Sequence, residues 1–508
     1  MVQKIDNYIH GAFVPPAADK YMDVHNPADG SVIAQVALSG PEDVEKAVES
    51  ASKAFKTWSK MTMKARVAIM LKFHALVNEH AKTLADMIVK ENGKNVNEAL
   101  ADVAKGNETL EYACSLPQLA QGRTLQVSSQ VHCRDKRVPL GVVASIVPFN
   151  FPLMVPFWTM PIALVMGNTM ILKPSEKVPM TMGYVADLMK QAGVPDGVFT
   201  MVQGTKDAVQ AIMEHDAVKA VTFVGSSPIA KLVATKCRAL NKRCTALGGA
   251  KNHLVALEDC EVQGAASDIC VSFAGCAGQR CMAASVLLLP PGSHHDELLE
   301  KLVAKAAAIQ PGSGAGEMGP VIDQPSYSKI MKYIDVAEKD GAKILLDGRS
   351  WKDQKGGNWI GPTILMHKSR EDKTMCEEVF GPVLSVYACE SWEEAVEIEN
   401  ANPFGNAACV YTTNGANADW FLTQFRAAML GVNIGIPVPR EPFSFGGLYG
   451  TESKYGDMDI TGDGGMEFFS NRIKVTSKWP LQRRKRAADE VTNGSNGKTD
   501  HANFAGSM

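Results

Sequence analysis

The stretch VTFVGSSPIAK, residues 221–231, decides the fold class of this chain. An apolar run ends at Gly225, and Ser226 is placed to cap the helix that we expect after it, whose N-terminus would attract an anion. Many strand-to-helix turns look like this, so the neighbouring sequence has to support the interpretation. The short apolar runs GVVASIV, TMILK and VFTMV alternate with helical stretches before it. Strands that alternate with helices predict a mostly parallel sheet and an α/β fold.

The same alternation predicts two domains. Residues 41–116 have apolar residues at helical spacing and form a helical layer before the first strand series. A second series of strands and helices begins after ALGGAKN, residues 246–252. A chain of 508 residues is also too long for one ordinary core. We therefore expect two parallel-sheet domains with a boundary near residue 250.

Composition narrows the possible partners. The chain has 45% apolar residues, 21% charged residues and a net charge of -3, which is typical of a globular protein that does not bind nucleic acid. The apolar run 151–166 is too short for a membrane span and contains three prolines, so we expect a buried segment with tight turns. The first residues show no targeting signal, which makes the cytoplasm the default location.

The eleven cysteines have irregular spacing, which favours free thiols and no metal site. Two of them lie in FAGCAGQRCMAAS, residues 273–285. Most cysteines are packing residues, and a nucleophilic one needs a nearby cation or backbone donors to lower its pKa. Cys281 follows Arg280 and a Gly-Gln turn, whereas Cys276 has neither. If either thiol is chemical, we expect it to be Cys281.

Two further strand ends carry polar residues. Asn150 lies in IVPFNFP, where a buried amide could be a turn residue or a fixed N–H donor for an oxyanion. Lys173 and Glu176 follow the next strand, in MILKPSEK. Nucleotides bind at the strand ends of open α/β sheets, although a surface pair is the plainer interpretation.

Together these residues resemble the aldehyde dehydrogenase superfamily, over about residues 1–480. Seven motifs carry the resemblance in the family's order: PFNFP (148–152), KPSE (173–176), FVGSS (223–227), LGG (247–249), GQRC (278–281), EEVFGPV (377–383) and FSFGG (443–447). The resemblance implies NAD(P)-dependent aldehyde oxidation through a thiohemiacetal on Cys281. The Asn150 amide and the Cys281 backbone N–H would hold the oxyanion.

The resemblance also implies a set of cofactor-binding residues. Lys173 and Glu176 would hold the adenosine ribose, Ser226 the pyrophosphate, and Glu378 with Phe380 the nicotinamide ribose. Glu176 would favour NAD over NADP by repelling a 2′-phosphate. The full predicted set is Val147, Phe149, Lys173, Glu176, Lys177, Gly225, Ser226, Gly248, Glu378 and Phe380.

One departure from the superfamily pattern is informative. Hydrolytic members have a glutamate immediately before LGG that activates water, and the residue before LGG here is Ala246. A thiol such as coenzyme A needs no strong base to accept the acyl group. With GGAKNH (248–253), this gap is similar to the methylmalonate-semialdehyde dehydrogenase branch. That branch implies oxidation of malonate or methylmalonate semialdehyde to acetyl-CoA or propionyl-CoA with loss of carbon dioxide, as in valine catabolism.

Substrates of this branch carry a carboxylate, which requires a cationic clamp. Arg280 matches the branch's arginine beside the nucleophile. The second arginine lies in a D-V-x-R-G stretch that here is DVAKG, so Lys105 takes its place. Lysine keeps the charge but loses the bidentate fork, and a solvated helix residue is the alternative interpretation of Lys105.

The resemblance further implies the domain bounds. Residues 1–118 and 139–248 would bind NAD, and 249–465 would form the catalytic domain. Residues 119–138 and 466–482 would be strands that pair subunits in a homodimer or homotetramer, and 483–508 would be a disordered tail. Animal members of the branch are mitochondrial, which is the alternative location.

Two other functions remain open at this point. A hydrolytic NAD(P)-dependent enzyme could take its base from elsewhere and act on another semialdehyde. A non-catalytic protein could also keep the fold, although the presence of both Cys281 and Asn150 argues against it.

Overall fold

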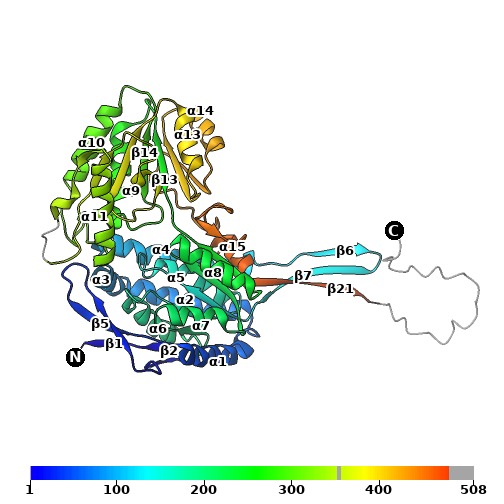
Figure 1. Cartoon of the computed structure of the whole chain (residues 1–508). Coiled ribbons are helices and arrows are strands. Elements are labelled where there is room, and N and C mark those ends of the chain that lie inside the picture. The colour runs from blue at the N-terminus through cyan, green and yellow to red at the C-terminus, as the bar shows by residue number, and fades with distance from the viewer. Residues whose placement is uncertain (1, 352–355, 480–508) are drawn as a thin grey trace, which may run out of the picture.

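The computed structural model describes residues 2–351 and 356–479. The described chain forms two α/β bodies, one around an eight-stranded sheet and one around a seven-stranded sheet, and a long β arm that projects from the first (Figure 1). The predicted tail, 483–508, and residues 480–482 of the predicted last strand lie outside the described residues.

The eight-stranded sheet has the order β20-β12-β11-β8-β9-β10-β2-β3. Its five central strands, from β12 to β10, are parallel to one another. At the edges, β20 is antiparallel to β12, β2 is antiparallel to β10, and β3 is antiparallel to β2. Every residue of β8 and β9 is buried, as expected for parallel strands that are covered on both faces. The strands are β2 (Asn7–Ile9), β3 (Ala12–Val14), β8 (Val142–Ile146), β9 (Thr169–Lys173), β10 (Phe199–Met201), β11 (Val218–Val224), β12 (Arg243–Leu247) and β20 (Lys454–Tyr455).

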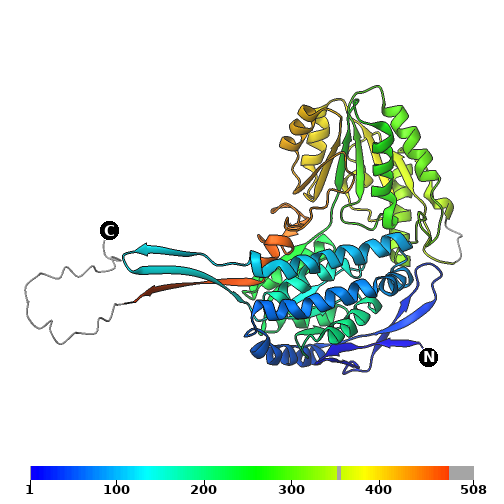
Figure 2. The same ribbon diagram turned by 180° about the vertical axis from the view of Figure 1, so that it is seen from behind.

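Helices cover both faces of this sheet. The helices α1 (Pro41–Trp58), α7 (Lys206–Glu214) and α8 (Ser227–Ala239) pack on one face. The other face is covered by α2 (Met63–Glu79), α3 (Ala81–Asn92), α4 (Val96–Leu119), α5 (Met154–Val165) and α6 (Met180–Ala192), which Figure 2 shows from behind. The apolar segment 151–166 is thus mostly the buried helix α5, where we expected tight turns. Pro156 lies in the first turn, where no backbone N–H is needed, and Pro161 is accommodated inside the helix.

The seven-stranded sheet has the order β15-β16-β17-β14-β13-β18-β19, and only β15 is antiparallel to its neighbour. Helices α9, α10 and α11 pack on one face and α13 and α14 on the other. The strands are β13 (Asn252–Ala256), β14 (Ala284–Leu289), β15 (Lys343–Leu346), β16 (Thr363–Met366), β17 (Val383–Ala388), β18 (Ala407–Tyr411) and β19 (Met429–Val432). The helices are α9 (Val262–Ala274), α10 (His295–Ala307), α11 (Gln324–Lys339), α12 (Lys373–Cys376), α13 (Trp392–Ala401) and α14 (Gly415–Gln424).

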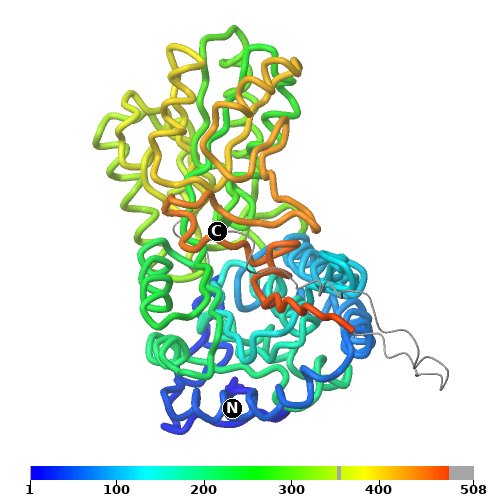
Figure 3. The backbone as a smooth tube through the Cα atoms, turned by 90° about the vertical axis from the view of Figure 1, so that its right-hand side faces the viewer, coloured from blue at the N-terminus to red at the C-terminus, as the bar shows by residue number. Residues whose placement is uncertain are grey.

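The chain returns to the first body after β19, along the segment drawn in orange in Figure 3. There β20 pairs with β12, and α15 (Gly462–Phe468) follows. Residues 454–465 therefore belong with the eight-stranded body, although we predicted that the catalytic domain extends to residue 465. A two-residue strand is too short to be recognised from sequence periodicity.

The arm is a three-stranded antiparallel sheet of β6 (Thr124–Ser128), β7 (Val131–Pro139) and β21 (Ser470–Lys478). Both segments that we predicted to be strands, 119–138 and 466–482, contribute to it. The apolar side chains of Leu125, Val127 and Ile473 are exposed on the arm. A smaller sheet near the N-terminus joins β1 (Gln3–Ile5), β5 (Val32–Ala37) and β4 (Tyr21–His25). Among the described residues, no helix combines the length and apolar character needed to cross a bilayer.

Candidate active site

Cys281 lines a cavity of about 460 Å³ between helices α4 and α5 and the segments 276–282 and 434–445. We call it the Cys281 cavity. Its wall includes the apolar side chains of Phe151, Trp158 and Phe445, and most of its exposed lining is apolar. Charged residues of α4 lie along one side. The cavity therefore suits a small organic molecule that has an apolar part and a charged part.

The turn before Cys281 has an unusual backbone. Cys276, Ala277 and Gly278 have φ values of +52°, +52° and +68°, and a Cβ atom at Gly278 would lie 2.0 Å from the carbonyl oxygen of Gly381. The backbone N–H of Cys276 donates to Oε1 of Glu98 at 2.6 Å. This left-handed turn is strained for the two non-glycine residues, and Glu98 fixes it to α4.

The backbone of Cys281 is held from the opposite side. Its carbonyl oxygen accepts from the side-chain amides of Asn252, at 2.8 Å, and Asn406, at 2.9 Å. The backbone N–H groups of Cys281 and Met282 are near the sulfur and favour its thiolate form. Burial raises the pKa of the Cys281 thiol to about 12, and the nearby Glu378 carboxylate adds to the rise, while the two N–H groups and Arg280 oppose it.

Asn150 lies beside the same turn. Its side chain is buried, and Nδ2 donates to the carbonyl oxygen of Gln279 at 3.0 Å, two residues before Cys281. The amide of Asn92 donates to the carbonyl oxygen of Phe149 at 2.8 Å and so fixes the segment that carries Asn150. The structure thus brings together Cys281 and the amide that we predicted from two distant motifs.

The two predicted substrate residues both line the Cys281 cavity. Nη2 of Arg280 lies 3.3 Å from Oε1 of Glu98, and Nη1 donates to the carbonyl oxygen of Val271 at 3.3 Å. Burial acts to lower the pKa of Arg280, but Cys276 and Glu98 outweigh it and the pKa is raised. Lys105 is 37% exposed and pairs with Glu108 at 2.8 Å. Arg280 is therefore a partly buried cation with a partner, and Lys105 is a more exposed cation at the rim.

Lys173 and Glu176 form an ion pair at the end of β9, with Nζ and Oε2 2.8 Å apart. Burial acts to raise the pKa of Glu176, but the charge and hydrogen bond of Lys173, with smaller contributions from the backbone and Lys177, together outweigh it and lower the pKa. Val147 follows the neighbouring strand β8, and its N–H donates to the carbonyl oxygen of Lys173 at 3.2 Å. These residues thus share one edge of the parallel sheet.

Aromatic residues from both bodies meet near that edge. The rings of Phe149 and Phe380 are edge to face, with centroids 6.0 Å apart. Nζ of Lys177 lies 5.0 Å from the ring centroid of Phe149 and 2.5 Å from Oδ2 of Asp323. Phe149 and Lys177 belong to the eight-stranded body, and Phe380 and Asp323 to the other. These contacts join the two bodies near the end of β9.

The glycines of the predicted set lie at the ends of β11 and β12, where the N–H of Gly225 donates to the carbonyl oxygen of Leu247 at 3.1 Å. A Cβ atom at Gly248 would lie 2.2 Å from the carbonyl oxygen of Glu452, so only glycine fits there. Ser226 is the N-cap of α8, but its side chain makes no capping bond. The uncapped end of α8, beside the Lys173–Glu176 pair, fits the phosphates and ribose of a dinucleotide.

A second hollow, of only about 10 Å³, is lined by Cys281 together with Ala250, Lys251, Glu378 and Phe380. The Glu378 carboxylate accepts from the N–H of Ala250 at 2.9 Å, and burial raises its pKa. Nζ of Lys251 donates to the carbonyl oxygen of Thr374 at 2.6 Å, and burial lowers the pKa of this lysine to about 8. These two charged residues therefore lie close to Cys281 in a tightly packed region.

The end of β12 carries two apolar residues on opposite faces of the sheet. Ala246 packs into the apolar cluster of α1, α7 and α8. Leu247 packs into the cluster on the opposite face. Successive strand residues point to opposite faces, so neither face receives a carboxylate from the end of β12, and Ala246, the residue before LGG, supplies no base.

Sequence reasoning missed two residues of this site, Glu98 and Lys251. Glu98 lies three residues after Asn95, whose side chain accepts the N–H of Glu98 as a helix cap, so the sequence indicates only a helix start. No pattern in the sequence around Lys251 indicates that its ammonium is buried.

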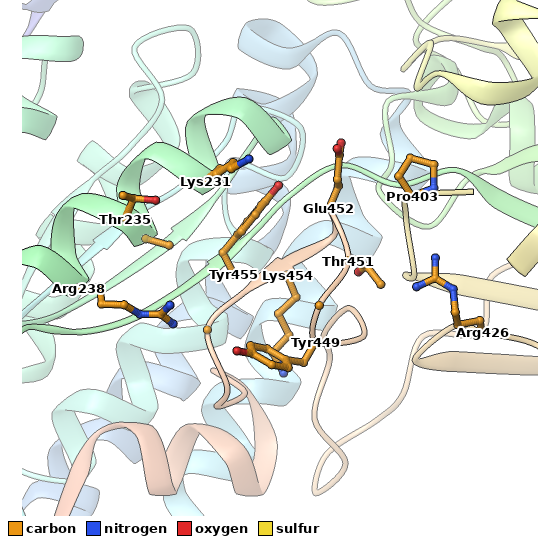
Figure 4. Close-up of a pocket in the computed structure, with 13 residues that line it drawn as sticks. Lys231, Thr235, Arg238, Pro403, Arg426, Tyr449, Thr451, Glu452, Lys454 and Tyr455 are labelled. Atoms are coloured by element: carbon orange, nitrogen blue, oxygen red, sulfur yellow. The ribbon is translucent and has the colours of Figure 1, made fainter. Parts of the chain in front are cut away.

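A different hollow of about 570 Å³ lies between α8 and residues 449–456 (Figure 4). Its lining includes Lys231, Arg238 and Lys454. Among the described residues it shares no lining residue with the Cys281 cavity, and it contains none of the predicted site residues. All eleven cysteines lie in the described part of the chain and are free, and no group of three or more metal-ligating side chains was found there.

Comparison with known proteins gives consistent similarities. Residues 13–475 match the model of the aldehyde dehydrogenase family. The chain is 42% identical over 485 residues to malonate-semialdehyde dehydrogenase 2 of Geobacillus kaustophilus, which covers 94% of this chain and 99% of that protein.

Solved structures are similarly close. Methylmalonate-semialdehyde dehydrogenase from Oceanimonas doudoroffii superposes with a TM-score of 0.92 at 37% identity, over 95% of this chain and 99% of that one. A protein from Sinorhizobium meliloti 1021, solved in complex with NAD, superposes with a TM-score of 0.92 at 34% identity, over 95% and 99% of the two chains.

Proposed function

Since the chain belongs to the aldehyde dehydrogenase family, we propose that it oxidises malonate or methylmalonate semialdehyde with NAD and transfers the acyl group to coenzyme A. Carbon dioxide is lost, and the products are acetyl-CoA or propionyl-CoA. The names of the relatives from Geobacillus kaustophilus and Oceanimonas doudoroffii support this substrate class.

In this proposal Cys281 is the nucleophile. Its thiolate attacks the aldehyde carbon and forms a thiohemiacetal, and the resulting oxyanion is held by the Asn150 amide and the Cys281 backbone N–H. The position of Asn150, bonded to the carbonyl oxygen of Gln279, supports this role. Such a donor contributes about 3 to 4 kcal/mol to the stability of the transition state.

NAD, when bound, would supply the oxidising power as a hydride acceptor, and the acyl group would stay on Cys281 as a thioester. Glu176 with Lys173 would hold the adenosine ribose, and the N-terminus of α8 at Ser226 the pyrophosphate. Glu378 and Phe380 would hold the nicotinamide ribose, and their position next to Cys281 supports this. Val147, Phe149, Lys177, Gly225 and Gly248 would shape the groove around the cofactor.

The observation that carries the choice of acceptor is the apolar end of β12, where Ala246 and Leu247 stand. Hydrolytic members have a glutamate at the position of Ala246, so a water molecule beside the thioester would lack that base here. The acyl group therefore passes to the CoA thiol, and Cys281 leaves as the thiolate. Overall, malonate semialdehyde, NAD⁺ and CoA give acetyl-CoA, CO₂ and NADH. The electron pair of the C–C bond broken on loss of CO₂ stays on the α-carbon, which takes up the proton released by the CoA thiol.

Arg280 and Lys105 would recognise the carboxylate of the semialdehyde. Both line the Cys281 cavity, and Arg280 immediately precedes the nucleophile in the chain. Because Glu98 already contacts Arg280, a substrate carboxylate would share or displace that contact.

One observation favours the hydrolytic alternative. Oε2 of Glu98 is buried at the same cavity and has no hydrogen-bond partner among the described residues. It could activate water if the thioester lay close enough. In that case the wild type would turn over without CoA, and Glu98→Gln would abolish this activity. Our proposal predicts instead that the wild type shows no turnover without CoA.

The proposal is tested by product analysis. Purified enzyme is incubated with NAD and malonate semialdehyde, with and without CoA, and the products are quantified by liquid chromatography and mass spectrometry. We expect acetyl-CoA equal to NADH when CoA is present. Equal yields of free acid with and without CoA would overturn the proposal in favour of hydrolysis.

We also propose that residues 1–118 and 139–248 bind the cofactor, that the seven-stranded body from residue 249 carries Cys281, and that the arm pairs subunits in a dimer or tetramer. The exposed Leu125 and Val127 on β6, an edge strand, support the last point. Sedimentation of Leu125→Glu with Val127→Glu tests it: a lower oligomer is expected, and an unchanged sedimentation coefficient would contradict it.

A further inference from the structure

Two groups of charged residues line the Cys281 cavity at different positions along α4. The inner group is Arg280 with Glu98. The outer group is Lys105, Glu108 and Arg440. Glu98 and Lys105 are seven residues apart on the helix, which corresponds to about 10 Å along its axis. The outer group therefore lies well beyond the inner one.

The outer group joins two cations through one carboxylate. Nζ of Lys105 donates to both oxygens of Glu108, at 2.8 and 3.1 Å, and the guanidinium of Arg440 contacts Oε2 of the same residue. The side chains of Lys105, Glu108 and Arg440 are 37%, 46% and 57% exposed. In the described part of the chain, Glu108 is the only carboxylate that forms an ion pair with either cation. The outer group thus has one negative charge, on Glu108, and two positive charges, on Lys105 and Arg440.

The position of Arg440 is set by its own segment. Val438 and Pro439 before it line the cavity, and Glu441 after it accepts a hydrogen bond from Oγ1 of Thr109 on α4 at 2.8 Å. Pro439 restricts the backbone, and the Thr109 bond ties the segment to the helix. The guanidinium is consequently kept at the rim of the cavity and does not hang freely in solvent.

We propose that Arg440 is a specificity-determining residue, which with Lys105 draws carboxylate-bearing aldehydes into the Cys281 cavity. This inference rests on the proposed function, because it assumes an anionic semialdehyde. An arriving carboxylate competes with Glu108 for the two cations, and Arg440 offers the bidentate fork that Lys105 lacks. Charges at a rim act mainly on the rate of association, and their effect decreases with salt.

The test compares malonate semialdehyde with propanal, an uncharged aldehyde of the same carbon number, both with NAD and CoA. The measured quantity is the ratio of their kcat/KM values at low salt. In Arg440→Gln we expect the ratio to fall about three- to tenfold and to depend less on salt. In Glu108→Gln, which removes the competing carboxylate and keeps the side-chain shape, we expect the ratio to rise.

Arg370→Gln is the matched control, because it removes an arginine that pairs with a carboxylate, Glu397, outside the cavity. Its ratio should equal that of the wild type. An unchanged ratio in both Arg440→Gln and Glu108→Gln would overturn the inference. Wild-type turnover without CoA would instead overturn the proposed function, and the ratio could still be measured.

Discussion

Ala246 and Leu247 are neighbours on β12, yet their side chains lie on opposite faces of the eight-stranded sheet, in two different apolar clusters. Both side chains are apolar, so the end of β12 offers no base to the thioester that we propose on Cys281. The two positions therefore form a matched pair for placing a carboxylate on one face of the sheet or the other.

A matched pair of substitutions tests this relationship. Ala246→Glu restores the residue that hydrolytic members have before LGG and should raise CoA-independent formation of free acid by about a hundredfold. Leu247→Glu, which places the carboxylate on the other face, should not. Each places a carboxylate in an apolar cluster and should lower the free energy of unfolding by about 3 kcal/mol or more. Free acid is measured by mass spectrometry and stability by urea unfolding, and a larger gain in Leu247→Glu would reverse the assignment.

Substitution of the two thiols in the turn 276–281 should have different effects on activity. Cys281→Ala should lower kcat by at least about a thousandfold, because the covalent step is lost. Cys276→Ala should keep the activity within about threefold of the wild type and reduce unfolding stability by about 1 kcal/mol, because Cys276 is a buried packing residue. NADH formation is followed at 340 nm. Full activity in Cys281→Ala would exclude it as the nucleophile.

Asn150→Ala should lower kcat about a hundred- to a thousandfold, since it removes the side-chain donor to the oxyanion. The KM for the semialdehyde should change little, because the bond forms only after Cys281 attacks. Steady-state kinetics measures both constants. A rise in KM with unchanged kcat would indicate instead that Asn150 holds the turn through its bond to Gln279.

The pH dependence of Cys281 offers a further check. Burial and then Glu378 raise the thiol pKa to about 12, so the free enzyme should react slowly with iodoacetamide near pH 7 and faster as pH rises. Removing the negative neighbour favours the thiolate, so Glu378→Gln should lower the pKa and speed alkylation at pH 8. Mass spectrometry of the peptide with Cys281 gives the rate. Slower alkylation in Glu378→Gln would contradict this electrostatic coupling.

The sequence predicts a structural feature well when the residues that form it are close together in the chain, and poorly when they are far apart. Strand and helix periodicity predicted both parallel sheets, and the position of Asn150 beside the turn of Cys281 followed from motifs. The details that determine acceptor and substrate depend on contacts between distant segments. Examples are Glu98 with Arg280, 182 residues apart, and Glu108 with Arg440, 332 residues apart. No local pattern encodes such pairs.

The most direct test of the central claim is the stoichiometry of NADH in rapid mixing of enzyme, NAD and malonate semialdehyde without CoA. We predict a burst of one NADH per active site followed by almost no turnover, because the thioester on Cys281 has no acceptor. Addition of CoA should then restore turnover, with one acetyl-CoA for each NADH. Continuous NADH formation without CoA, with free acid as the product, would contradict the claim.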